Sequence, residues 1–226
     1  MIKGHTMYET IVFDLDGTLL DTLDDLTDAT NAALEKFGLK SRTRDEVRSF
    51  VGNGIAKLIE RAVGEDGKQY QAEALEEFKR HYAKHCADKT APYEGILSLL
   101  QTLQAQGVKT AVVSNKADFA VKSLAKTYFD GLLLAAVGED EAAGISKKPA
   151  PDSLLAVMAQ LSATAENTVY VGDSEVDIQT AKNAGVDCIC VTWGFRDKGY
   201  LMEEGGKLFV DAPAEILTYI KGACTR

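Results

Sequence analysis

The sequence lacks the features that would place the protein in a membrane, in the secretory pathway or on nucleic acid. No apolar stretch approaches the roughly 20 residues that a membrane-spanning helix needs. The opening residues, MIKGHTM, have no apolar centre like that of a signal peptide. Acidic residues outnumber basic ones by 34 to 25, giving a net charge of −9, whereas nucleic-acid-binding proteins normally carry a basic face. We therefore expect a cytoplasmic protein with no membrane or nucleic-acid partner.

Cysteine and histidine are also scarce, and neither is spaced like a set of metal ligands. The four cysteines form no CxxC pair, which favours small buried side chains in a reducing compartment over a disulfide or metal role. The three histidines show no HExxH or triad pattern, and we interpret them as structural. Neither residue type therefore points to a functional site.

Short apolar runs predict the strands of a sheet. They are Thr10–Phe13, Lys109–Val113, Leu132–Ala135, Thr168–Val171, Cys188–Val191 and Leu208–Val210. Their apolar character is continuous rather than alternating, which is typical of strands covered on both faces in a parallel sheet. Helical patterns lie between them, such as Ser174–Gly185, which has a serine N-cap and a glycine stop. We predict an α/β fold with a doubly wound core, whose ligands would lie beyond the carboxyl ends of the strands.

One region, from Asp21 to about Pro92, breaks this alternation. It contains no strand pattern but three amphipathic stripes at helical period. The stripes are Leu23, Leu26, Thr30, Ala33, Leu34 and Phe37; Ile55, Leu58, Ile59 and Ala62; and Leu75, Phe78, Tyr82 and Cys86. We predict a helical cap domain at residues 22–92, inserted into a core of residues 1–21 and 93–226, with hinges at 20–23 and 91–95.

Acidic residues gather where the first predicted strand ends, in the stretch IVFDLDGTLLDT. Asp14 and Asp16 lie two positions apart, so both can face the same way, while Gly17 permits a sharp turn and Thr18 can satisfy the freed amides. A turn with capping aspartates explains one carboxylate but not two that repel each other. A hard cation explains both, because Mg²⁺ usually combines one or two carboxylates with a substrate phosphate.

Matching polar groups stand near the ends of other predicted strands. They are Ser114-Asn115, Lys148-Pro149, and Gly172-Asp173-Ser174 followed by Asp177. Each has an ordinary interpretation when taken alone: Ser114 could be an N-cap, Lys148 a solvated lysine, and Asp177 a first-turn charge favoured by the helix dipole. Their combination and order indicate one site.

The set DLDGT, SN, KP and GDSxxD resembles the four signature motifs of the haloacid dehalogenase-like phosphatase superfamily. The resemblance covers most of the chain and implies a Rossmann-like core with a helical cap inserted after the first motif. The stretches FVGNGIAKLIERA, APYEGI and VTWGF are similar to the phosphoglycolate phosphatase branch. The resemblance therefore implies a Mg²⁺-dependent phosphoric monoester hydrolase, a monomer or dimer, acting on a small phosphorylated metabolite such as 2-phosphoglycolate.

The resemblance also implies roles for the motif residues. Asp14 would attack phosphorus to form an aspartyl-phosphate, Asp16 would serve as acid and then base, and Ser114 and Lys148 would hold the phosphoryl oxygens. The implied Mg²⁺ ligands are the Asp14 carboxylate, the Asp16 backbone carbonyl and the Asp173 carboxylate, with Ser174 and Asp177 behind them. The expected substrate- and phosphate-binding residues are Gly17, Thr18, Asn115, Gly52, Asn53, Gly54 and Lys57.

Several of these positions keep two interpretations. The amides of Gly52-Asn53-Gly54 precede a helix and could bind an anion, or Asn53 could simply cap that helix. Lys57 could meet a substrate carboxylate or be a surface charge, which is also how we interpret Arg61. Asp21 is interpreted as a helix cap or hinge residue outside the acidic cluster.

Other functions stay open on the same core. A β-phosphoglucomutase-type phosphomutase is one, although VGNGIAK lacks the Ser-Arg pair that such mutases tend to show there. A pyrophosphatase or nucleotidase is another. A catalytically inactive phosphate-binding protein is disfavoured because Asp14, Asp16 and Lys148 are all present, and a dehalogenase because dehalogenases of this superfamily lack the second aspartate.

Overall fold

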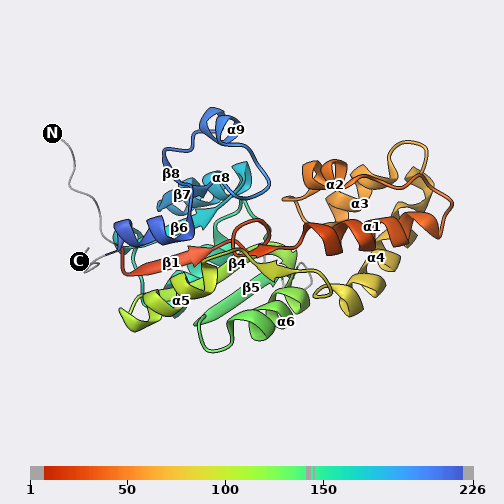
Figure 1. Ribbon diagram of the computed structural model, residues 1–226. Helices are drawn as coiled ribbons and strands as arrows, with labels where there is room; N and C mark the ends of the chain where they lie inside the picture. Colours follow the sequence, from red (N-terminus) through yellow and green to blue (C-terminus); the bar gives the residue numbers. More distant parts are fainter. Residues whose placement is uncertain (1–7, 141–143, 145, 221–226) are drawn as a thin grey trace.

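A six-stranded parallel sheet forms one part of the molecule and a group of helices the other (Figure 1). The computed structural model describes residues 8–140, 144 and 146–220. The strands are β1 (Thr10–Phe13), β4 (Lys109–Ala117), β5 (Ala135–Glu139), β6 (Thr168–Gly172), β7 (Asp187–Val191) and β8 (Leu208–Val210). Their order across the sheet is β5-β4-β1-β6-β7-β8, and every neighbouring pair is parallel. The predicted α/β core is confirmed.

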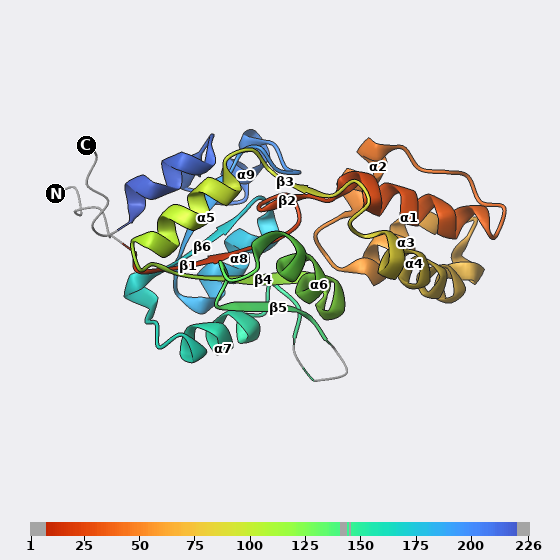
Figure 2. The ribbon, with the colours of Figure 1, turned by 60° about the horizontal axis from the view of Figure 1, so that its bottom comes forward.

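Helices cover both faces of this sheet, which explains the continuous apolar runs. Helices α5 (Ile96–Ala105) and α6 (Asp118–Phe129) cover one face; α7 (Asp152–Gln160) and α8 (Glu175–Ala184) cover the other (Figure 2). On central strand β1, Ile11 and Phe13 belong to one buried cluster and Val12 to another. Both clusters exclude water, so Ile11, Val12 and Phe13 are all apolar, and the first carboxylate appears where the strand ends, at Asp14.

One predicted strand was misplaced. We expected it at Leu132–Ala135, but β5 begins at Ala135, where its pairing with Ala111 starts. Leu132 and Leu133 instead lie in the turn after α6 and pack against the core as partly buried side chains. An apolar run indicates burial, but burial alone does not distinguish a strand from a packed turn.

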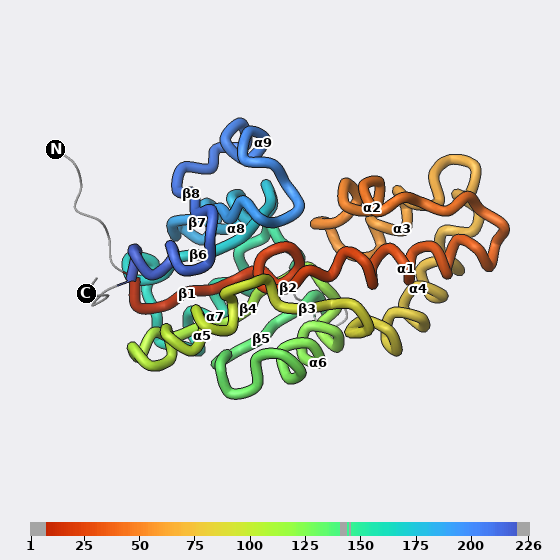
Figure 3. Tube along the Cα trace, viewed as in Figure 1, coloured from red at the N-terminus to blue at the C-terminus, as the bar shows by residue number. Residues whose placement is uncertain are grey.

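The helices of the second part lie between two very short strands. The chain leaves the sheet through β2 (Leu20–Asp21) and returns through β3 (Ala91–Pro92), and these two pair antiparallel, as the trace in Figure 3 shows. The helices between them are α1 (Leu23–Glu35), α2 (Arg44–Phe50), α3 (Ile55–Val63) and α4 (Gln71–His85). We call α1–α4 the helical insertion; its division from the core at residues 22–92 stays a proposal.

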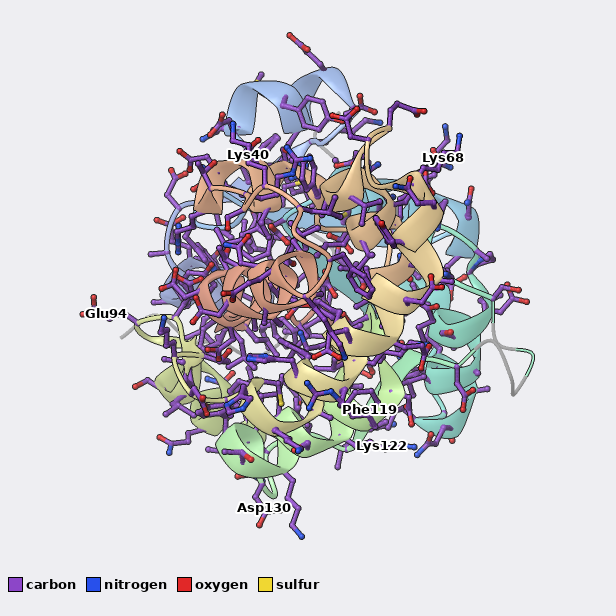
Figure 4. All side chains as sticks on the ribbon, turned by 90° about the vertical axis from the view of Figure 1, so that its right-hand side faces the viewer. Lys40, Lys68, Glu94, Phe119, Lys122 and Asp130 are labelled. Carbon is purple, nitrogen blue, oxygen red and sulfur yellow. The ribbon has the colours of Figure 1, made fainter. Side chains whose placement is uncertain are left out.

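Three of the four helices of the insertion carry the apolar stripes expected of them, and most stripe residues are buried. Helix α2 was not predicted because Val47 is its only buried residue. The sequence does contain a signal for the start of this helix, because Thr43 and Glu46 form a capping box. Viewed from the end of the insertion, Lys40 and Lys68 mark its outer loops, while Phe119 and Lys122 mark α6 of the core (Figure 4).

The structure also shows where the cysteines and two of the histidines lie. Cys86 and Cys190 are buried and Cys188 is half-buried, each as a free thiol, whereas Cys224 lies outside the described residues. Within the described part of the chain, no helix is long and apolar enough to cross a membrane. His81 and His85 stack on one face of α4 with ring centroids 4.5 Å apart, as helix neighbours do.

Candidate active site

A small cavity of about 40 Å³ lies where the carboxyl ends of β1, β4 and β6 meet the helical insertion. Polar residues after these strands line it on the sheet side: Asp14, Asp16, Ser114, Asn115, Lys116, Asp173 and Ser174. Apolar side chains and glycines of the insertion line the opposite side. Because parallel strands end on one edge of the sheet, residues distant in sequence converge there.

Three buried carboxylates form the acidic part of the site. Oxygen atoms of Asp14, Asp173 and Asp177 lie within 4.8 Å of one another, and all three residues are buried. Burial raises the pKa of Asp14 to about 6 despite the opposing charge of Lys148, with Asp177 and Asp16 adding to the rise. Burial followed by the charges of Asp177 and Asp14 likewise raises the pKa of Asp173 well above its usual value. The cluster is therefore unfavourable when fully ionised.

Lys148 supplies positive charge to this cluster. Its Nζ lies 2.7 Å from Asp177 and 3.0 Å from Asp14, and it donates to the Tyr170 hydroxyl at 3.0 Å. Burial alone would lower the pKa of Lys148, but the charges of Asp14 and Asp177 outweigh it and raise the pKa well above its usual value. One lysine does not neutralise three buried carboxylates, so a further positive charge would stabilise the site.

The turn after β1 fits closely around Asp173. Gly17 has a φ of +80°, and a Cβ there would approach Asp173 Oδ2 to 2.4 Å, so only glycine fits. Thr18 donates its hydroxyl to Asp173 Oδ1 at 3.2 Å, and the amide of Phe195 donates to Oδ2 at 2.6 Å. The structure thus shows Gly17 and Thr18 positioning Asp173; their expected role in phosphate binding stays a prediction.

The donor set fits a divalent cation. Asp14 Oδ1 is buried, and its partner Lys148 Nζ, 3.0 Å away, is shared with Asp177 and is not aligned for a hydrogen bond to Asp14. Buried carboxylates that share one cation are incompletely neutralised, and an oxygen-preferring cation between Asp14 and Asp173 would offset their charge. Asp177 is already engaged by the backbone amides of Asp173 and Ser174 and by the Ser174 hydroxyl. Asp177 and Ser174 therefore suit the expected supporting position.

Asp16 has a different partner, which sequence reasoning missed. Lys116 donates to both carboxylate oxygens of Asp16, at 2.9 and 3.1 Å, and to the hydroxyl of Tyr82 at 2.6 Å. The Lys116 side chain is 2% exposed. Burial alone would lower the pKa of Lys116, but Asp16 and Tyr82 raise it above its usual value. Lys116 directly follows the Ser114-Asn115 motif, so its position in the sequence was the available signal.

Asn115 joins three segments rather than presenting a free amide. Its Nδ2 donates to the carbonyls of Gly52 and Lys148, and its Oδ1 accepts from the Lys148 amide. Both of its N–H donors are therefore used within the protein. Ser114, by contrast, lines the cavity, and its Oγ accepts from the Lys116 amide at 3.3 Å. A hydroxyl that accepts there keeps its own hydrogen available to a ligand.

The loop of the insertion only partly matches expectation. Gly52 and Gly54 line the cavity, with φ angles of +119° and +84°. Asn53 points elsewhere: its Oδ1 accepts from Arg61, so it neither caps α3 nor lines the cavity. Lys57 does not line the cavity; its side chain is 44% exposed and pairs with Glu60 at 2.5 Å, so its contact with a substrate stays a prediction.

Arg61 and Asp21 have structural contacts. Arg61 donates to the Phe50 carbonyl at 2.8 Å, tying α3 to the preceding loop. Asp21 accepts from the Leu23 amide at 3.3 Å, at the start of α1, and pairs with Arg44. Asp21 is thus a helix-start residue outside the acidic cluster, as expected.

Comparison with known proteins places this site in a family. The sequence model described as haloacid dehalogenase-like hydrolase matches residues 11–191. The chain belongs to this family. The match spans every motif residue described above, from Asp14 to Asp177, and the chain is therefore a hydrolase.

Its relatives place it in the expected branch. It is 34% identical over 190 residues to a phosphoglycolate phosphatase of Aquifex aeolicus, covering 82% of this chain and 85% of the relative. It is 33% identical over 221 residues to one of Colwellia psychrerythraea, covering 94% and 97%. A crystal structure from Lactobacillus delbrueckii subsp. bulgaricus superposes with a TM-score of 0.88 at 38% identity, covering 96% of this chain and 99% of that one. The prediction of a phosphatase of the phosphoglycolate phosphatase-like branch is confirmed.

Proposed function

We propose that this haloacid dehalogenase-like hydrolase cleaves a small phosphorylated metabolite, with 2-phosphoglycolate as the leading substrate, through an aspartyl-phosphate on Asp14. The observation that carries the proposal is the buried carboxylate of Asp14 in a cavity that Asp16 and Ser114 also line, with Lys148 Nζ 3.0 Å away. A buried carboxylate beside a second carboxyl group and a cation can serve as the nucleophile of a covalent route. The names of the relatives support the choice of substrate.

The chemistry divides into two steps. In the first, an Asp14 oxygen attacks phosphorus, the bond to the ester oxygen breaks, and Asp16 gives its proton to the departing oxygen. In the second, Asp16 takes a proton from water as the water oxygen attacks phosphorus, and the bond to Asp14 breaks to release phosphate. Ser114 and Lys148 would stabilise charge on the phosphoryl oxygens.

We include Mg²⁺ as the cofactor in this proposal. Asp14 and Asp173 would hold it, together with the backbone carbonyl of Asp16, while Ser174 and Asp177 fix the position of Asp173. When bound, the ion would act as a Lewis acid toward the phosphoryl oxygens.

The helical insertion contributes the apolar side of the cavity, so we propose that it is the expected cap and that it selects the substrate. The names of the relatives favour a phosphatase over a sugar phosphomutase, a pyrophosphatase or a nucleotidase. We keep the expectation of a cytoplasmic enzyme, monomeric or dimeric.

A substrate panel tests the proposal. Phosphate release with Mg²⁺ should be fastest for 2-phosphoglycolate and at least about tenfold slower for hexose phosphates, nucleoside monophosphates and pyrophosphate, because contacts made to the preferred leaving group are lost with the others. Faster release from a nucleotide or pyrophosphate would contradict the substrate assignment. Turnover of β-glucose 1-phosphate to the 6-phosphate without net phosphate release would favour the mutase.

Lys116 gives a test of the role of Asp16. Lys116→Met should lower the single-turnover rate of ester cleavage about 100-fold for an alkyl phosphate but less than about threefold for p-nitrophenyl phosphate, because a nitrophenolate leaves without protonation. Single-turnover rates are compared because the later attack by water is common to both esters. The variant removes the partner that orients Asp16, so the loss should follow the basicity of the leaving group. Lys122→Met is the matched control, since Lys122 pairs with Asp118 on the surface of α6. Equal losses on both esters would assign Lys116 a purely structural role.

A further inference from the structure

The loop after β7 connects the site to the helical insertion through Arg196. This arginine lines the cavity. It donates from Nη1 to the carbonyl of Arg48 at 3.0 Å and from Nη2 to the carbonyl of Val51 at 2.8 Å, both in the insertion. Its Nε pairs with Glu175 of α8 at 3.3 Å. The guanidinium thus stands between the core and the insertion with its side chain only 15% exposed.

Arg48 makes the reciprocal contact from the other side. It belongs to α2 of the insertion and donates from Nε to the carbonyl of Phe195 at 2.7 Å and from Nη2 to that of Gly194 at 3.3 Å. Its side chain is 36% exposed and lines an outer cleft, not the cavity. The two arginines therefore hold the same two segments together, but only Arg196 reaches the reaction space.

Arg196 is also the cation of the cavity with donors to spare. The three N–H donors of Lys116, the other cation lining the cavity, are used by Asp16 and Tyr82. Arg196 has five N–H groups, and three of them have acceptors among the described residues. The described side chains that the insertion contributes to the cavity carry no charge. A second anionic group on a substrate would therefore find its counter-charge on Arg196.

Arg196 Nη2 lies beside the insertion loop, where it donates to the Val51 carbonyl. It would stand 3.7 Å from a Cβ built on Gly52, and the missing side chain at Gly52 leaves this edge of the guanidinium uncovered. Asp14, Asp16 and Asp173 occupy the opposite, sheet side of the cavity. A phosphate held over Asp14 would direct its ester group toward the insertion, and thus toward Arg196.

We propose that Arg196 is the specificity-determining residue of this enzyme and binds the carboxylate on the leaving group of the proposed substrate. A planar guanidinium suits a carboxylate because it can donate two parallel hydrogen bonds. The inference rests on the proposed phosphatase function and goes beyond it by naming the residue that recognises the leaving group. It also explains how an enzyme with a mostly apolar insertion selects an ester that carries a second anionic group.

The experiment compares two glutamine variants on two esters of similar size. Kinetics with Mg²⁺ are measured for wild type, Arg196→Gln and Arg48→Gln on 2-phosphoglycolate and on 2-hydroxyethyl phosphate, which has a hydroxyl in place of the carboxylate. We expect Arg196→Gln to lower kcat/KM for 2-phosphoglycolate about 30- to 100-fold more than for 2-hydroxyethyl phosphate, the size of a lost charge-assisted hydrogen bond. Arg48→Gln breaks the same junction but should lower both values by one common factor.

The other possible results would contradict either the role of Arg196 or the proposed function. Equal losses on both esters in Arg196→Gln would overturn the specificity role and leave the arginine as a structural clamp. A wild type that hydrolyses both esters without preferring the carboxylate would overturn this inference alone. A wild type inactive on every phosphate ester would remove the proposed function and this inference with it. If Arg196→Gln does not fold, as judged by thermal denaturation, Arg196→Lys gives the same comparison, because it keeps the charge but loses the paired donors.

Discussion

Asp14→Asn is expected to lower kcat by at least about four orders of magnitude on every phosphate ester, the scale of losing a covalent nucleophile. The amide is nearly isosteric with the carboxylate but cannot attack phosphorus. Rates should be measured with freshly purified protein on both alkyl and aryl phosphates. Activity within about tenfold of wild type on either ester would remove Asp14 as the nucleophile.

Asp14→Asn should not unfold the protein. A loss of activity in a folded variant can then be assigned to the chemistry rather than to the structure. Asp14 is buried beside two further carboxylates with Lys148 as the nearby cation, so removing its charge relieves repulsion. We expect a Tm equal to or above that of the metal-free wild type. Asp21→Asn is the control, since Asp21 lies seven residues further along the chain and its side chain accepts from the Leu23 amide and pairs with Arg44, away from the cavity. Its activity should stay within about twofold of wild type.

The parts of the fold that could be predicted are those fixed by local physics. Strand β1 is buried on both faces, so its continuous apolar run could be recognised without knowing its neighbours. Helix α8 begins at a capping box on Ser174 and ends at Gly185, whose φ of +74° requires a left-handed residue. Because such signals are encoded within a few residues, the elements that present Asp14, Asp173 and Asp177 were placed correctly.

The parts that could not be predicted depend on contacts between distant segments. The start of β5 at Ala135 is set by pairing with Ala111, 24 residues earlier, and no local feature records that register. Lys57 follows a glycine-rich loop and looked available to a substrate, but helix geometry placed Glu60 within reach. A charged side chain near a site in sequence is therefore weak support for a role in it.

The same limit explains the residues that sequence reasoning missed. Lys116 gains its significance from Asp16, 100 positions away, and from Tyr82 in the insertion. Arg196 gains its significance from carbonyls of the insertion about 145 positions earlier. Motif residues can be recognised because a family shares their chemistry. The roles of Lys116 and Arg196 depend on contacts between the insertion and the core, which the sequence does not reveal.

Removal of divalent metal is the second change expected to have a very large effect. EDTA should abolish turnover and Mg²⁺ should restore it, because Asp14 and a phosphate are both anionic and must approach each other in a buried site. Binding should also be visible without activity. At a Mg²⁺ concentration 100 times Kd the native state gains about 2.7 kcal/mol, which for a chain of 226 residues raises Tm by about 5–10 °C.

The thermal shift identifies the ligands, which activity alone would not. Asp173→Asn should lose most of the Mg²⁺-dependent rise in Tm, since it removes one of the two carboxylates proposed to hold the ion. Asp130→Asn, at an exposed position after α6 (Figure 4), should keep the full rise and so exclude a general effect of charge. Full activity in chelator would reject the metal requirement. An undiminished shift in Asp173→Asn would place the ion away from the three buried carboxylates, and Lys148 would then be the cation that neutralises Asp14.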